Sequence, residues 1–377
     1  MKSVLILLSA GVFTLSCVPL AQAYNNSDLN RAYRCDDDSP FELANCDFSN
    51  ADLSNANLSS LGFTFKSFTN ANFSNAILRY IGLGYAGLEN ANFTNANLSG
   101  IPGDFSVLHF AYMKNTNFTG ANLSYVNLNS GYMFNTNFTG ANLSNSRITE
   151  INRGPRLAQD SVPSNIIFTN ANLSYANLGG NLSGAKLQRA NLTGANLNYA
   201  TLIGADLTGA IVKGTNFTNA ILTNAILNYA DPDTPPTFHG ANLDGVSAIG
   251  AQLNDADFQG ASIHGANFDL ANLMGADFTG VSLVNDSFRG ADLDGAIFEG
   301  ANLVGDDFFG ASLHDVVFKG AILTDDEFQQ ILADGFTGIL PDGTTAVPDP
   351  SNVLGVSAGI FFVGSMFSLT RKAKKRD

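Results

Sequence analysis

Residues 190–209 read ANLTGANLNYATLIGADLTG, which is four consecutive units of five residues. Each unit begins with a small Ala, has Leu at its third position and ends mostly with Gly. We call the third position the centre of the unit; it is Leu or Phe in most of the chain. Centres follow one another in three runs, Phe48 to Ile148, Phe168 to Leu227 and Phe238 to Phe328, which is about 50 units. A repeat this dense indicates one repetitive domain, although 377 residues would suffice for two ordinary ones.

A period of five residues suits neither an α-helix nor a flat strand. In a helix the centres would be spread around the axis, because five residues advance about 140° beyond one turn. In a flat strand the side chains alternate with a period of two. A chain that turns a corner every five residues places both the small residue and the centre inside. Asn or Gly at the fifth position suits the positive φ of such a corner. The sequence therefore predicts stacked coils around a core of Leu and Phe.

Three irregularities interrupt the pattern. Gly103 is the one small residue at a centre of the first run, and a single residue is missing near 179–182 in the second run. Residues 149–165 lack the motif, yet Ile148 and Phe168 are four whole units apart, so we expect either one degenerate coil or a loop pushed outward. The second break, 229–237, is rich in Pro and predicts a loop. Both breaks are read as tolerated insertions, with a binding loop as the alternative.

The repeats resemble those of the pentapeptide-repeat family over roughly residues 46–328. Three stretches carry the resemblance: Ala121-Asn122-Leu123-Ser124, Ala190-Asn191-Leu192-Thr193-Gly194 and Ala205-Asp206-Leu207-Thr208-Gly209. The resemblance implies an all-β fold, a right-handed four-sided β-helix with about four units in each coil. We assign the solenoid to residues 46–323.

The N-terminus has the pattern of a secretory signal peptide over residues 1–23. Lys2 is its one charge, an apolar stretch follows, and Ala21-Gln22-Ala23 is a small-x-small cleavage pattern. Residues 24–45 are expected to form an N-terminal cap region. After export, Cys35 and Cys46 either form a disulfide or serve as two small apolar side chains, and the sequence leaves both readings open.

The segment 324–346 is expected to close the other end of the solenoid. Thr324-Asp325-Asp326-Glu327 is a capping box that predicts a short helix from Asp325 to about Ala333. Its apolar residues are expected to cover the last coil, and a linker follows.

The final segment, 347–377, combines three features in a fixed order. Pro348, Asp349 and Pro350 precede Val353–Leu369, an uncharged stretch that is just long enough for a membrane span. A basic tail follows, with Arg371, Lys372, Lys374, Lys375 and Arg376. The set resembles the PEP-CTERM sorting signal of Gram-negative bacteria and cyanobacteria, with Asp349 where the family motif has Glu. The resemblance implies processing by an exosortase, after initial anchoring in the inner membrane with the tail inside; a plain membrane anchor is the alternative.

The charge distribution argues against nucleic acid as a partner. Residues 24–347 contain 31 acidic and 13 basic residues, a surface that repels phosphates and anionic lipid. His109, His239, His264 and His314 are scattered without a nucleophile pattern. No cofactor or metal site of the usual kind is predicted.

Two acidic residues stand where the repeat has Ala. Asp286 and Asp306 occupy the inward small-residue position and are four units apart, so a coil of four units stacks one on the other at about 5 Å. Such a pair must be protonated, hydrogen-bonded or bridged by a cation such as Ca²⁺. We favour a backbone donor or local access to water, with the cation as the alternative.

The sequence therefore predicts an exported, non-catalytic structural or interaction protein of the bacterial envelope or extracellular matrix. Expected partners are envelope proteins or exopolysaccharide, besides the exosortase and the membrane. The expected location is periplasmic, cell-surface or extracellular. Two alternatives stay open: a DNA-mimicking topoisomerase binder, suggested by the acidic surface, and an enzyme that uses the 149–165 loop.

Overall fold

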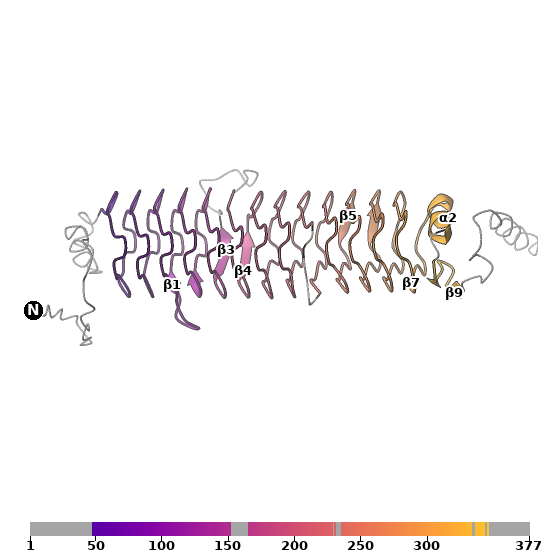
Figure 1. Ribbon diagram of the computed structural model, residues 1–377, viewed down its shortest axis with the longest axis horizontal. Coiled ribbons are helices and arrows are strands. Elements are labelled where there is room, and N and C mark those ends of the chain that lie inside the picture. Colours follow the sequence, from indigo (N-terminus) through magenta and orange to yellow (C-terminus); the bar gives the residue numbers. More distant parts are fainter. Residues whose placement is uncertain are drawn as a thin grey trace, which may run out of the picture.

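The computed structural model describes residues 47–151, 165–228, 230, 235–333, 336–343 and 345–346. These residues form a straight rod of stacked coils with helix α2 at one end (Figure 1). Four pentapeptides make one turn of the rod, because residues four units apart lie side by side in parallel pairing. Asp52 pairs with Asn72, for example, and Asn302 with Ile322. The coil of four units that the family resemblance implies is confirmed.

Each unit buries two of its five residues, as the repeat predicted. Ala91 and Phe93 have no exposed surface, whereas Asn92 and Thr94 between and beyond them are partly exposed. Every coil adds one more layer to a single continuous core, because the same two positions point inward on all four sides. The rod is therefore stabilised mainly by contacts between neighbouring coils.

Phenylalanines at the centres stack face to face along the rod. On one side the ring of Phe278 lies 4.6 Å from that of Phe258 and 4.9 Å from that of Phe298, with nearly parallel planes. Aromatic rings prefer stacks that are offset, and each such pair adds about 0.5–1.5 kcal/mol to the burial of its area. These columns occupy the interior, and their residues are fully buried.

The corners of the coil fall on the fifth residue of each unit, where φ is positive. Asn is frequent there, as at Asn70 (φ 58°), because its short polar side chain tolerates this conformation. The structure also places larger residues at corners, among them Phe65, Tyr85 and Tyr199. Their side chains point away from the core and are exposed.

The unit around Gly103 does not contribute to the coil, so its place in the series of centres was wrong. Gly82 pairs with Val107, which is five units later instead of four, and the extra unit projects from the side (Figure 1). Backbone hydrogen bonds of 2.9 and 3.0 Å between Ile101 and Asp104 close this projection as a small hairpin. The physical reason is that Gly103 has no side chain to bury and Pro102 has no N–H to donate.

The stacking of coils on either side of residues 149–165 also differs from the expected one. Ile148 pairs with Leu178, six units later, instead of stacking on the centre Phe168, which is four units later. Phe168 stacks on Phe138, again six units away. This turn of the rod therefore contains two units more than the usual four, so 149–165 is not a single degenerate coil. Residues 152–164 lie outside the described residues.

The regular strands are short because each side of the coil holds few residues in extended conformation. They are β1 (Ser106–Val107), β2 (Val126–Asn127), β3 (Arg147–Ile151), β4 (Asn177–Gly180), β5 (Ser262–His264), β6 (Ser282–Val284), β7 (Val316–Val317), β8 (Gly338–Ile339) and β9 (Thr345–Ala346). Pairing is parallel between coils, and β8 pairs antiparallel with β9. Between β3 and β4 the register shifts, where the chain is one residue short.

Helix α2 spans Asp325–Ala333, the range that the capping box predicted. Thr324 N donates to Glu327 Oε2 at 2.5 Å, and Glu327 N donates to Thr324 Oγ1 at 3.4 Å. Glu327 also accepts a hydrogen bond from Gly305 N of the preceding coil, and Ile331 is buried against the core. Within the described part of the chain, none of the helices has the length and hydrophobicity that a bilayer span requires.

Replacing Glu327 by alanine is expected to lower the free energy of local unfolding at this end of the rod by about 1–2 kcal/mol, because both the helix N-terminus and Gly305 N lose their acceptor. Hydrogen exchange of residues 324–333 should accelerate, while exchange in the middle of the rod should not change. The matched control is Asp326→Ala in the same turn, which leaves the capping box intact. Equal acceleration in both variants would contradict this role.

Candidate functional site

Asp286 and Asp306 lie inside the rod, one above the other, as their spacing predicted. They are 2% and 4% exposed. Asp286 Oδ1 accepts a hydrogen bond of 2.6 Å from Ala266 N, and Asp306 Oδ1 accepts one of 2.9 Å from Asp286 N. Each carboxyl therefore bonds to the backbone of the coil before it. The second oxygen, Oδ2, has no hydrogen-bond partner in either residue.

Burial raises the pKa of both carboxyls well above the ordinary 3.8. The pKa of Asp286 rises to about 7, although the N–H of Ala266 opposes the shift. The pKa of Asp306 rises to about 8, and the neighbouring carboxylates of Asp286 and Glu327 add to the effect of burial. A protonated carboxyl in each place is the form that this environment favours.

A cation bridge at this pair stays a hypothesis. Within the described ranges, no three side chains of His, Cys, Asp or Glu lie close enough together to hold a metal ion. Ca²⁺ takes six to eight oxygen ligands, and one oxygen of each carboxyl already accepts a backbone N–H. The backbone donor that we favoured is present.

Two surface clusters combine Asp, Ser and His, but their geometry does not make a nucleophile. Asp244 Oδ1 accepts both from Ser262 Oγ at 3.0 Å and from His264 Nδ1 at 2.7 Å. Ser262 therefore donates to a carboxylate, whereas a nucleophilic serine donates to the base that takes its proton. Despite partial burial, the bonds from His264 and Ser262 lower the pKa of Asp244. The same arrangement recurs at Asp294, Ser312 and His314.

The other two histidines also lie on the surface without a nucleophile. His109 packs edge-on against the ring of Tyr85 at 5.3 Å. His239 Nδ1 lies 3.7 Å from Asp257 Oδ2. The four histidines are scattered along the rod, but sequence reading missed that three of them have a carboxylate neighbour. The signal was available, because each of these Asp and His pairs is separated by about one coil in the sequence.

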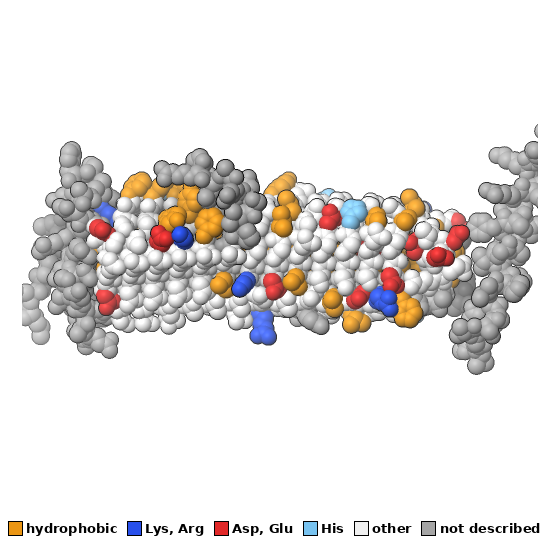
Figure 2. Space-filling model, turned by 90° about the horizontal axis from the view of Figure 1, so that it is seen from above, with side chains coloured by type: hydrophobic (Ala, Val, Ile, Leu, Met, Phe, Trp, Pro, Cys, Tyr) orange, Lys and Arg blue, Asp and Glu red, His pale blue; other side chains and the backbone are white. Residues whose placement is uncertain are grey.

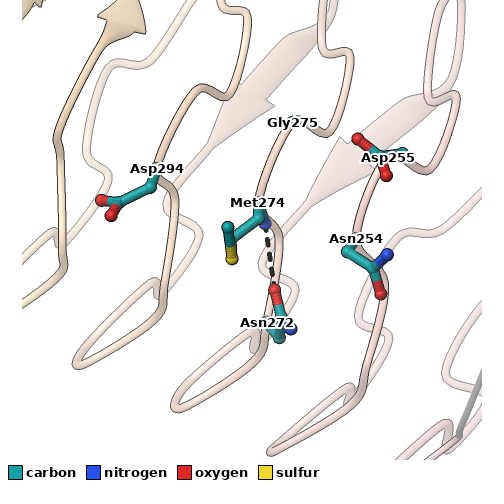
Figure 3. A pocket seen from close by; sticks show the side chains of 6 residues that line it. All are labelled: Asn254, Asp255, Asn272, Met274, Gly275 and Asp294. Carbon is teal, nitrogen blue, oxygen red and sulfur yellow. Dashed lines mark hydrogen bonds between the residues drawn. The ribbon is translucent and has the colours of Figure 1, made fainter.

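A shallow surface depression of about 440 Å³ lies beside the second cluster. Figure 3 shows its lining, which comes from successive coils: Asn254, Asp255, Asn272, Met274, Gly275 and Asp294. Asn272 Oδ1 accepts from Met274 N at 3.2 Å, and Asp294 is bonded to Ser312 and His314. Among the described residues of this lining there is no Ser, Cys, His or Lys to act as a nucleophile or as a neutral base.

Charge is distributed very unevenly between the two halves of the rod. Described residues from 47 to 230 include six acidic and seven basic side chains, whereas those from 235 to 346 include sixteen acidic and two basic ones. Figure 2 shows acidic side chains concentrated toward the end of the rod that carries α2. The tyrosines show the opposite distribution, because all seven in the described residues lie between 80 and 199. The overall composition concealed this division.

Several predicted features lie outside the described residues. These are the signal peptide 1–23, Cys35, Cys46, the motif Pro348-Asp349-Pro350, the span Val353–Leu369 and the tail residues Arg371, Lys372, Lys374, Lys375 and Arg376. Their roles stay predictions.

Comparison with solved structures finds matches at low identity, several of them pentapeptide repeat proteins. A trypsin-treated form of QnrB1, a plasmid-mediated fluoroquinolone resistance protein, is 18% identical with a TM-score of 0.36, over 55% of this chain and 90% of that one. HetL, a pentapeptide repeat protein involved in heterocyst differentiation regulation from the cyanobacterium Nostoc sp. strain PCC 7120, is 24% identical with a TM-score of 0.17, over 84% and 98%. A pentapeptide repeat protein of the Arabidopsis thaliana thylakoid lumen is 24% identical with a TM-score of 0.16, over 42% and 86%. The comparison with curated proteins finds no match.

The family model of pentapeptide repeats matches this chain in eight copies. The matched residues are 42–79, 105–140, 181–214, 202–231, 237–273, 271–305 and 287–325. Together they cover more than half of the sequence. Proteins of this family fold as right-handed four-sided β-helices, in agreement with the register described above. The chain belongs to the pentapeptide repeat family.

Proposed function

We propose that this chain is an exported, non-catalytic interaction protein of the bacterial envelope or extracellular matrix. The proposal is supported by the combination of a regular rod with sequence patterns, 1–23 and 347–377, that resemble a signal peptide and a sorting signal. The rod offers a long surface whose side chains bond mainly to one another, as in the ladder that joins Asn70, Asn90 and Asn115. Such a surface supports a role in holding partners rather than converting a substrate.

We assign a covering role to α2 as part of this proposal. A solenoid exposes an unpaired edge at its last coil unless another element covers it. Ile331 of α2 is buried against the core, and Gln330 Nε2 donates to Asp307 Oδ1 at 3.0 Å. The helix therefore protects the rod from end-to-end association in the envelope.

Cell fractionation followed by intact mass measurement tests the export proposal. We expect the mature protein outside the cytoplasm, without residues 1–23 and cut near Pro348-Asp349-Pro350, because the sequences there resemble processing signals. Non-reducing measurement also reports whether Cys35 and Cys46 are bonded, which lowers the mass by about 2 Da for the two hydrogens lost.

The control is Ala23→Leu, which places a large residue at the cleavage site and should leave the signal attached. A chain of full length found only in the cytoplasm would contradict the proposal.

The acidic half favours a second candidate, a binder that imitates the charge of DNA. Besides the buried Asp286 and Asp306, fourteen acidic side chains against two basic ones in the described residues from 235 to 346 give a strongly negative surface. Inhibition of a purified topoisomerase by the protein, relieved by salt, would favour this candidate over the envelope role. An enzyme site at 149–165 is tested by screening hydrolase substrates before and after deletion of that segment.

A further inference from the structure

One corner of the rod carries a line of residues that we call the corner row. It consists of the residues two positions after the centres of one side: Phe65, Tyr85, Phe110, Ser130, Glu150, Gly180 and Tyr199. Backbone bonds between successive coils keep these corners in register. With six steps of about 4.8 Å, the row is about 30 Å long.

The first part of the corner row is aromatic and exposed. The rings of Phe65 and Tyr85 stack at 4.7 Å, and those of Tyr85 and Phe110 also at 4.7 Å. Phe65 is 69% exposed although it adopts φ 62°, a conformation that costs a non-glycine residue about 1 kcal/mol. Asn would fit the backbone of this corner better, and stacking between the rings offsets part of that cost. The rings nevertheless leave exposed apolar surface that a partner could cover.

The second part of the row contains a shallow depression of about 220 Å³. It forms where the chain is one residue short, between β3 and β4, because Gly179 and Gly180 have no side chains to fill the surface. A Cβ on Gly180 would lie 2.8 Å from Ile151 N, so this position requires glycine. The depression is lined, among others, by Glu150, Asn177, Asn196, Asn198 and Tyr199.

The chemistry of this lining suits sugar hydroxyl groups. Asn196 Nδ2 donates to Asn177 Oδ1 at 3.4 Å, and Asn196 Oδ1 accepts from Asn198 N at 3.2 Å. A side-chain amide has two N–H donors and an oxygen with two lone pairs, so these bonds leave donors and acceptors for a hydroxyl group. Tyr199 is 68% exposed at the wall of the depression, and an aromatic ring with a polar tip packs against the C–H face of a sugar while its hydroxyl stays hydrated. The row thus combines apolar rings with amides along one line.

Charge decides which polysaccharide fits. The half of the rod that carries the row is almost neutral, whereas the other half repels polyanions. Among the described residues that line the depression, Glu150 carries the one carboxyl, which further disfavours an acidic sugar.

We propose that a neutral, linear polysaccharide binds along the corner row, with a sugar ring against Tyr199 and its hydroxyls on Asn177, Asn196 and Asn198. The inference rests on the proposed matrix function and deepens it, because it names the class of partner.

Native electrophoresis of the purified protein in gels that contain a polysaccharide tests the site. The probes are hydroxyethyl cellulose and dextran as neutral chains and alginate as a polyanion. We expect retardation by at least one neutral probe and none by alginate. Tyr199→Asn should weaken the retardation about tenfold, and Asn is the residue that corners of this rod normally carry.

The matched control is Tyr175→Asn, because Tyr175 is 64% exposed at a different corner and does not line the depression. It should bind as the unmodified protein does, and both variants should melt as cooperatively as that protein. Lack of retardation by both neutral probes, equal losses in the two variants, or stronger binding of alginate would each overturn the proposal. The test uses purified protein, so its failure is separate from a failure of export.

Discussion

Replacing Phe278 by alanine is expected to cost about 3–5 kcal/mol of unfolding free energy. Phe278 is fully buried and is stacked between Phe258 and Phe298 in the interior. The neighbouring coils are held in place by their backbone ladders, so they close the resulting cavity only partly. Denaturation by urea should show the loss, and hydrogen exchange should locate it in the coils next to residue 278.

The matched control for this substitution is Phe309→Ala in the same half of the rod. Phe309 is 60% exposed and contacts Arg289 by a cation–π interaction at 5.2 Å. Its removal should cost less than about 1 kcal/mol. A similar loss at both positions would mean that the phenylalanine columns do not dominate the stability of the solenoid.

Replacing both Asp286 and Asp306 by Asn is expected to remove a strong dependence of stability on pH. In the folded chain these carboxyls lose their protons near pH 7 and 8, whereas in the unfolded chain they lose them near the ordinary 3.8. The folded state therefore binds more protons between about pH 4 and 8, so the stability of the wild type falls as the pH rises through this range. Below pH 4 the contribution is fully present.

The groups that face this pair set the size of the effect. Burial dominates at both residues, the carboxylates of Glu327 and Asp244 oppose ionisation, and His264 favours it. Asn keeps the oxygen that accepts the backbone N–H and carries no charge. We therefore expect the double variant to be more stable than the wild type by about 3 kcal/mol or more at pH 9, with little difference at pH 4.

Melting curves between pH 4 and 9, with and without calcium, provide the measurement. Asp326→Asn is the control, because it removes an exposed carboxyl of α2 and leaves the buried pair Asp286 and Asp306 unchanged. Stabilisation of the wild type by calcium, lost in the double variant, would support the cation hypothesis instead. Parallel pH profiles for the wild type and the double variant would show that the pair does not carry a raised pKa.

Much of the fold follows directly from the repeat. A five-residue period with two apolar positions, Ala and the centre, predicts a chain that turns and stacks, and residues such as Phe93 and Ala91 are buried where the pattern placed them. The four-sided cross-section followed from the family resemblance. Helix α2 was predictable because Thr324 and Glu327 form a capping box whose signal is local. The stacking of Asp286 on Asp306 followed from the coil of four units.

The sequence did not predict where a turn of the rod contains more than four units. Gly103 and Phe168 both fall on the series of centres when the sequence is counted in steps of five. The residues that stack across these two places are nevertheless five and six units apart instead of four. An extra unit preserves the period in the sequence whether it lies inside the coil or outside it, so periodicity alone does not distinguish the two. The corner row escaped notice for a related reason, because residues in line along the rod are a whole coil apart in the sequence.

The hairpin closed by Ile101 and Asp104 makes the rod a convenient carrier for foreign sequence. Its two backbone bonds hold the ends of the loop together, and Pro102 and Gly103 at its tip are exposed. A peptide inserted between them should not disturb the core, because this unit already projects from the coil and does not pair with the neighbouring coils. An inserted epitope would therefore be displayed at a defined position along the rod.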